Sequence, residues 1–178
     1  SYFTAGMGYA VAAGNPKNVD ENDLCGLNVA VETGTVEEEA INKTAKQCKA
    51  DGKKDITIQS SKQQTDATTA VVTGKADVFF ADSPVVGYAI AQTDGQLEQL
   101  GKDFDEVPNA IAIKKGDSQT TEAVQKAMQK LMDDGTYTKI LQHWGVESGA
   151  LDKAEINPAV AKIRMGRTVC NTVAPFVH

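Results

Sequence analysis

Residues 27–39, with the sequence LNVAVETGTVEEE, decide the fold prediction for this chain. The apolar first half predicts a buried strand, and the acidic second half, which follows a glycine turn, predicts the start of a helix. A helix that begins directly after a strand presents free backbone N–H groups, which attract a carboxylate or a phosphate. A second interpretation needs no ligand, because Thr35 and Glu38 have the spacing of a capping box. The turn Thr33-Gly34-Thr35 is therefore either an anion site or an ordinary helix cap.

The composition indicates a globular protein and argues against several function classes. Of the 178 residues, 41% are hydrophobic, which is enough for a buried core. The 18 basic residues form no cluster that would follow a nucleic-acid backbone, and they are outnumbered by 24 acidic residues. No apolar run approaches the roughly 18 to 20 residues that span a bilayer, and Ser1 does not begin an export signal. We therefore expect no nucleic-acid partner, and we expect the chain to begin within a longer protein.

Three cysteines and two histidines limit the chemistry. Cys25 and Cys48 flank the first predicted strand and helix of this unit, so in an exported protein a disulfide bond between them would link the two elements. In a cytosolic protein they would be buried free thiols. Cys170 remains in the tail, either free or available to another chain. Without a Cys-x-x-Cys motif or a histidine cluster, we expect no metal site, no catalytic triad and no cofactor.

Strand and helix patterns alternate over the first half of the chain, as in an α/β protein. The predicted strands are 9–13, 27–31, 56–59 and 77–81, with further strands near 97–100 and at 109–114. The predicted helices are 36–48, 64–73 and a third that follows the cap Ser83, with Pro84 at its first position. This order predicts an open α/β sheet with right-handed crossover connections.

After the turn at 115–117 the pattern changes to helices alone. The first of them, from about Thr120 to Gly135, carries one apolar face made of Ala123, Val124, Ala127, Met128, Leu131 and Met132. The second begins at Thr136 and carries Tyr137, Ile140, Leu141 and Trp144. Because no long strands follow, these faces need a partner from elsewhere. We expect that partner to be the tail, a second copy that exchanges elements in a homo-oligomer, or a separate N-terminal fragment.

Four segments in this order resemble one protein family. They are GLNVAVETGT at 26–35, GKADVFFADSPV at 74–85, AIAIKKG at 110–116 and DGTYTKILQHWG at 134–145. Together they resemble the extracellular solute-binding proteins, family 3, from Ser1 to about Pro158. The resemblance implies amino acid transport, with the membrane permease and ATPase of an ABC importer as partners. It also implies an extracytoplasmic location, periplasmic or cell-surface, with a lipid anchor on an upstream segment as one option.

The resemblance implies a type II periplasmic-binding-protein fold, in which two α/β lobes close on an amino acid. Residues 1–14 would be the first crossover strand and 15–108 the ligand-binding lobe 2. Residues 109–158 would be the return crossover and the C-terminal helices of lobe 1, and 159–178 an unassigned tail. The chain would therefore hold one complete α/β lobe and the helices of an incomplete first lobe. The arginine with which that lobe clamps the ligand carboxylate has no counterpart here.

The family's two main ligand-binding positions match Thr35 and Asp82. Thr35 matches the position whose backbone N–H and hydroxyl bind the ligand α-carboxylate, and Gly34 allows close approach. Asp82 matches the acid that accepts the α-ammonium group. Both follow predicted strands, and a zwitterion suits an anion site and a carboxylate at neighbouring strand ends. The alternative for Asp82 is a solvated residue ahead of the Ser83 cap.

Three further residues are candidates for contacts with the ligand side chain: Thr33, Gln64 and Thr65. Each has a plain alternative as a solvated residue at a turn or a helix start. Two other functions stay open, namely a ligand-free truncated remnant or interaction module, and a soluble dehydratase on the same fold. A dehydratase requires an acid over a leaving group, for which only Asp82 and Glu32 are available. We therefore expect binding rather than catalysis.

Overall fold

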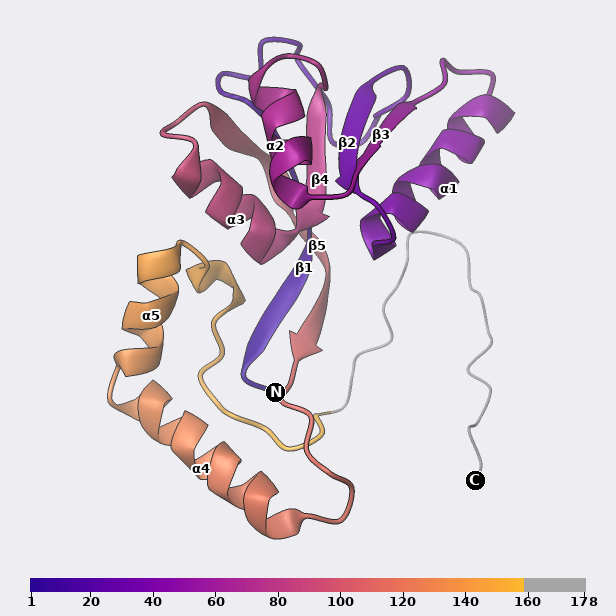
Figure 1. The fold of residues 1–178 in the computed structure, drawn as a ribbon. Coiled ribbons are helices and arrows are strands. Elements are labelled where there is room, and N and C mark those ends of the chain that lie inside the picture. The colour runs from indigo at the N-terminus through magenta and orange to yellow at the C-terminus, as the bar shows by residue number, and fades with distance from the viewer. Residues whose placement is uncertain (159–178) are drawn as a thin grey trace.

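The computed structural model describes residues 1–158 and shows a five-stranded sheet with helices on both faces, continued by a smaller helical part (Figure 1). The strands are β1 (Phe3–Ala12), β2 (Asn28–Glu32), β3 (Thr57–Ser61), β4 (Val78–Asp82) and β5 (Leu97–Asn109). The helices are α1 (Val36–Ala50), α2 (Gln64–Val72), α3 (Ser83–Gln92), α4 (Ser118–Asp133), α5 (Thr136–Trp144) and the 3-10 helix η1 (Glu147–Gly149). Within residues 1–158, none of the helices combines the length and the apolar character that crossing a membrane requires.

The sheet is mixed, with the strand order β3-β2-β4-β1-β5. β2 pairs in parallel with both β3 and β4, which confirms the predicted α/β core. β1 is antiparallel to β4 and to β5, so the parallel arrangement is confined to three strands. The C-terminal ends of β2, β3 and β4 therefore lie at one edge of the sheet.

The two central strands, β2 and β4, are buried on both faces. Successive side chains of a strand point to opposite faces. On one face, Ala30 and Phe79 pack with side chains of α2 and α3. On the other face, Val29, Val78 and Phe80 pack with side chains of α1. All five residues are at most 2% exposed. The apolar run of β4 therefore forms a buried parallel strand, as predicted.

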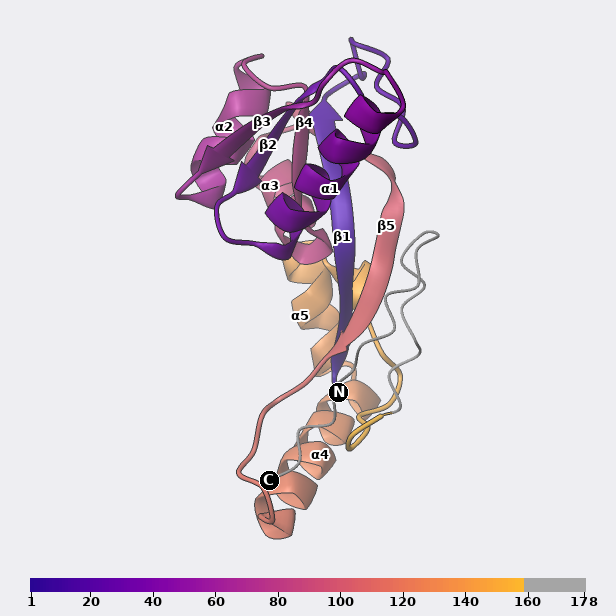
Figure 2. The same cartoon turned by 90° about the vertical axis from the view of Figure 1, so that its right-hand side faces the viewer.

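β1 and β5 form a pair of long strands that leaves the sheet and reaches the smaller helical part (Figures 1 and 2). Phe3 pairs with Asn109 at one end, and Ala12 pairs with Leu97 at the other. The sequence prediction was wrong about the limits of these strands. β1 begins at Phe3 rather than at residue 9, and residues 109–114 form no separate strand. β5 instead runs the full length of β1 and ends where its partner ends, because a strand needs a neighbour to pair with.

The helices α4 and α5 leave most of their apolar side chains only partly buried. No residue of α4 is buried, and in α5 only Tyr137 is buried. The Tyr137 hydroxyl donates to the carbonyl oxygen of Tyr2 (2.8 Å) and accepts from the N–H of Leu151 (3.0 Å). Trp144 is 51% exposed and contacts Tyr88 of α3 with 6.2 Å between ring centroids. The apolar faces thus lack a full partner within residues 1–158, as expected from the sequence.

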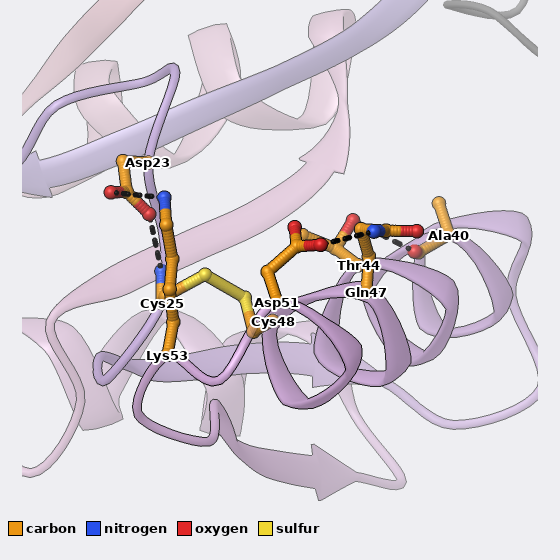
Figure 3. The surroundings of a disulfide bond; sticks show 8 residues. All are labelled: Asp23, Cys25, Ala40, Thr44, Gln47, Cys48, Asp51 and Lys53. Atoms are coloured by element: carbon orange, nitrogen blue, oxygen red, sulfur yellow. Dashed lines mark hydrogen bonds and ion pairs between the residues drawn. A yellow bond between two sulfur atoms is a disulfide. The ribbon is translucent and has the colours of Figure 1, made fainter.

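A disulfide bond joins Cys25 and Cys48, which confirms the predicted pairing (Figure 3). It links the loop before β2 to the last turns of α1, and Cys48 packs in the cluster between α1 and the sheet. Beside it, the Lys53 ammonium donates to the Asp23 carboxylate at 2.8 Å. The bond therefore anchors the C-terminal end of α1. Cys170 and the rest of the tail lie outside the described residues.

Removal of this bond is expected to lower the free energy of unfolding by about 3 kcal/mol, because its partners are 23 residues apart and an unlinked chain gains that much entropy on unfolding. Urea titration of Cys25→Ala and Cys48→Ala, followed by circular dichroism, measures the loss. The double variant should lose little more than either single variant, since each change removes the same bond. Losses that add fully in the double variant would contradict this expectation.

Candidate functional site

The ends of the three parallel strands form the edge at which the predicted ligand-binding residues lie. β2, β3 and β4 each lead directly into a helix, α1, α2 and α3 respectively. In Figure 1 these helices all begin at the lower edge of the sheet, on the side that faces α5 and the projecting ends of β1 and β5. We call residues 32–37, 61–65 and 82–83 the strand-end edge. It contains all six residues that the sequence singled out for ligand binding.

Thr35 caps α1 through one of the two bonds of the predicted capping box, whereas the second goes to the N–H of Gly34 in place of that of Thr35. Its hydroxyl oxygen accepts from the N–H of Glu38 (3.2 Å), and its hydroxyl donates to the carbonyl oxygen of Glu32 (2.9 Å). The Glu38 carboxylate in turn accepts from the N–H of Gly34 (2.7 Å) and from the Ser60 hydroxyl. These bonds, the one from Gly34 first, hold the pKa of Glu38 below its usual range. The carboxylate of Glu38 is therefore already hydrogen-bonded to a backbone N–H group at the predicted anion site.

Asp82 stands at the N-cap position of α3, yet its side chain makes no hydrogen bond to the helix. The prediction that Ser83 caps this helix was wrong. Ser83 lies inside the helix, and its hydroxyl oxygen accepts from the N–H of Gly6 in β1 (3.2 Å). β1 runs beside β4 with Met7 opposite Asp82, so a donor of the neighbouring strand engages the hydroxyl. The exposed Asp82 carboxylate is left available for a cation.

Gln64 and Thr65 begin α2 on the same edge. The side-chain oxygen of Gln64 is buried and has no hydrogen-bond partner among the described residues, which is uncommon for a buried acceptor. Thr65 is exposed, as is Thr33. The N–H of Thr33 donates to the carbonyl oxygen of Ser61 (2.8 Å) and so ties the end of β2 to the end of β3. The edge thus offers one unpartnered amide oxygen and two exposed threonines.

Glu37 also belongs to this edge, and sequence reasoning missed it. It is 4% exposed, and its Oε1 atom is buried without a hydrogen-bond partner within residues 1–158. Burial raises the pKa of Glu37 and the charge of Asp82 raises it further, while hydrogen bonds from its own N–H and from Thr35 act in the opposite direction. The sequence analysis used the three successive acids only to predict the start of a helix. The sequence did contain one signal for the burial of Glu37. Ile41 lies one turn later on the same face of the helix and is fully buried, so that face is turned toward the core.

Two cavities of the described chain lie away from the strand-end edge. One of about 250 Å³ lies between residues 110–116 and α4, and its lining includes Tyr2 and Met128. The other borders Tyr9 and Gly101. Within residues 1–158, no group of three or more His, Cys, Asp and Glu side chains is placed to hold a metal ion. The strand-end edge itself is polar, with Thr33, Thr65 and Asp82 exposed.

Comparison with known proteins gives a consistent set of relatives. The family model for bacterial extracellular solute-binding proteins, family 3, matches residues 1–147. The arginine-binding protein ArgT of Corynebacterium glutamicum is 38% identical over 157 residues, which are 88% of this chain and 51% of that protein. The glutamine-binding protein GlnH of Bacillus subtilis is 26% identical and is matched over 84% of this chain and 51% of its own length. The chain therefore spans about half the length of these curated relatives.

Solved structures support the same fold. An ancestral cationic amino acid solute binding protein superimposes with a TM-score of 0.67 at 28% identity, over 80% of this chain and 58% of the other. An ancestral arginine-binding protein bound to arginine gives a TM-score of 0.58 at 27% identity, over 80% and 61% of the two chains. The chain has the type II periplasmic-binding-protein fold over the part that is shared, which confirms the fold class predicted from the sequence.

The cap at the start of α1 can be tested without any ligand. Thr35→Ala is expected to lower the free energy of unfolding by about 1 kcal/mol, because the N–H of Glu38 loses its acceptor. Thr35→Ser keeps the hydroxyl and should retain most of the wild-type stability. Urea unfolding at neutral pH measures both variants. Equal losses would indicate that the threonine methyl group, and not the cap, carries the effect.

Proposed function

The chain belongs to the bacterial extracellular solute-binding proteins, family 3, and we propose that it binds a polar amino acid as part of the receptor of an ABC importer. The observation that carries this proposal is the strand-end edge. Thr35 follows β2 and Asp82 ends β4, and these two strands are direct parallel neighbours. Neighbouring strands lie about 5 Å apart, so an anion site and a carboxylate at their ends match the two charges of an amino acid.

In this proposal the ligand binds by exchange of partners. The α-carboxylate of the ligand accepts from the backbone N–H groups of Gly34 and Thr35, where the Glu38 carboxylate now accepts from Gly34. Asp82 accepts the α-ammonium group, since its side chain has no hydrogen bond to α3. One carboxylate replaces another, so the N–H group of Gly34 stays bonded in both states.

The ligand side chain is proposed to meet Gln64, Thr65 and Thr33. The buried, unpartnered oxygen of Gln64 requires a donor. The curated relatives are named for arginine and for glutamine, and both of these side chains end in N–H donors. A polar amino acid with a donor group at its end is therefore the ligand class that this edge supports best.

We propose that the sheet and the smaller helical part belong to two different lobes. Residues 15–108 would form the ligand-binding lobe 2, with 1–14 and 109–158 as the crossover strand and the helices of lobe 1. The support is the β1/β5 pair, which connects the two parts. The uncovered faces of α4 and α5 would then pack against further elements of lobe 1 or against a second copy of the chain.

The partners of such a receptor are a membrane permease and an ATPase. The family is extracellular by description, and a disulfide bond suits an oxidising compartment outside the cytoplasm. Lipid anchoring through an upstream segment fits this proposal. The relatives are named as binding proteins, which favours binding without catalysis.

Calorimetric titration of the 178-residue chain with L-arginine and L-glutamine tests the ligand class. Binding of at least one is expected, and Asp82→Asn should weaken it about 100-fold, because an ammonium group that loses its carboxylate partner costs about 3 kcal/mol. Asp94→Asn, an exposed change at the opposite end of α3, serves as the matched control. Absence of binding, together with no amino acid in a mass spectrum of the denatured chain, would overturn the proposal.

The uncovered helices lead to an expectation about assembly. The chain alone is expected to self-associate, because no residue of α4 is buried. Light scattering should give a mass above that of one chain. Met128→Lys, on the apolar face, should shift the mass toward the monomer, whereas Lys126→Gln, on the exposed side of the same helix, should not. A wild-type monomer at high concentration would contradict this expectation.

A further inference from the structure

Glu37 is a buried acid with an unpartnered oxygen beside the proposed ammonium site. It lies in the first turn of α1, and α1 packs on the sheet close to the end of β4, where Asp82 stands. We propose that Glu37 and Asp82 form a carboxyl pair that holds one proton while the site is empty and releases it when an ammonium group binds. This inference rests on the proposed amino-acid binding and concerns the same site.

The burial of the two residues differs, and this difference gives them different roles. Glu37 is 4% exposed and its Oε1 atom is shielded, whereas Asp82 is exposed at the edge. Two carboxylates on adjoining elements repel each other when both are ionised, and burial deprives the inner one of the solvation that would offset its charge. The proton is therefore held on Glu37, whose O–H then donates toward Asp82. A ligand meets Asp82 and not Glu37, so Glu37 is a positioning residue.

Within residues 1–158, no cation is among the groups that shift the pKa of Glu37. The ionisable groups at the ends of the three neighbouring strands are Glu32 at the end of β2, Lys62 after β3 and Asp82 at the end of β4. Of these three, Asp82 is the one that acts on the pKa of Glu37. The ion pairs formed within residues 1–158 involve neither carboxylate of the pair. On α1 itself, Glu38 is engaged with Gly34 and Ser60. In the proposal, the positive charge that arrives at Asp82 is the ammonium group of the ligand.

On binding, the ammonium group of the ligand replaces the proton of the carboxyl pair as the positive charge. The ligand ammonium donates its N–H to Asp82, its charge lowers the proton affinity of Glu37, and the proton passes from the Glu37 O–H to water. The ligand-bound pair then consists of two ionised carboxylates and one ammonium group. Protons compete with the ligand, so binding becomes tighter as the pH rises through the titration range of the pair. If one proton is released per ligand, the affinity for the ligand changes about tenfold for each pH unit in that range.

The test measures the protons released when L-arginine or L-glutamine binds. Titration calorimetry in two buffers with different protonation enthalpies gives this number at mildly acid pH. Release approaching about one proton per ligand is expected for the wild type and for the exposed control Glu39→Gln. Glu37→Gln keeps the shape of the side chain, and its amide imitates the protonated acid, so release should be lost and the pH dependence should flatten. Unchanged release in Glu37→Gln would overturn the proposal.

A ligand-free measurement separates this inference from the proposed function. In a carbon NMR titration of the empty chain, one glutamate carboxyl should titrate above the usual range. That signal should be absent in Glu37→Gln and should move back toward the usual range in Asp82→Asn. If this pattern is found but neither amino acid binds, the shared proton is supported and the proposed function fails. If every glutamate titrates in the usual range, the carboxyl pair is refuted whether or not an amino acid binds.

Discussion

Parallel pairing of β2 with its two neighbours is the constraint on which the rest of this structure depends. Two parallel strands must be joined by a crossover connection, which α1 provides between β2 and β3 and α2 between β3 and β4. The C-terminal ends of all three strands therefore lie at one edge of the sheet. The same pairing buries β2 and β4 on both faces, so their interior residues are apolar and the polar ones are confined to the ends. Thr35, Gln64 and Asp82 therefore share the strand-end edge because of the topology and without any direct bond between them.

The features of the fold and of the site that could be predicted are those encoded by residues close to each other in the sequence. The turn at Thr35, the buried run of β4 and the Cys25–Cys48 pairing each involve residues close in sequence or flanking one unit, and sequence patterns indicated all three. The limits of β1 and β5 depend on each other although the two strands are far apart in the sequence, so neither segment alone specified them. Ser83 was assigned as a cap because its competing donor, the N–H of Gly6, belongs to a strand 77 residues away.

The acids of the strand-end edge show how environment separates identical functional groups. Glu37 and Glu38 are adjacent in sequence, yet burial and the charge of Asp82 raise the pKa of the first, while the N–H of Gly34 and the hydroxyl of Ser60 lower that of the second. Helix geometry is the cause, because consecutive residues lie about 100° apart around the axis, and one faces the sheet while the other faces the turn. Sequence reasoning used the acidic run only as the sign of a helix start, and this explains why it found the cap and missed the buried carboxyl.

The β1/β5 pair has a mechanical consequence. Residues 3–6 of β1 lie beyond its pairing with β4 and span about 13 Å, so this end of the pair forms a short arm between the two parts of the chain. A rotation of about 10° at the base of this arm displaces its far end by about 2 Å. The two register shifts near Met7, with left-handed backbone at Gly101 and Asp105 in the partner strand, mark where the arm departs from a regular ladder. A twist in these few residues would thus change the orientation of the helical part relative to the strand-end edge.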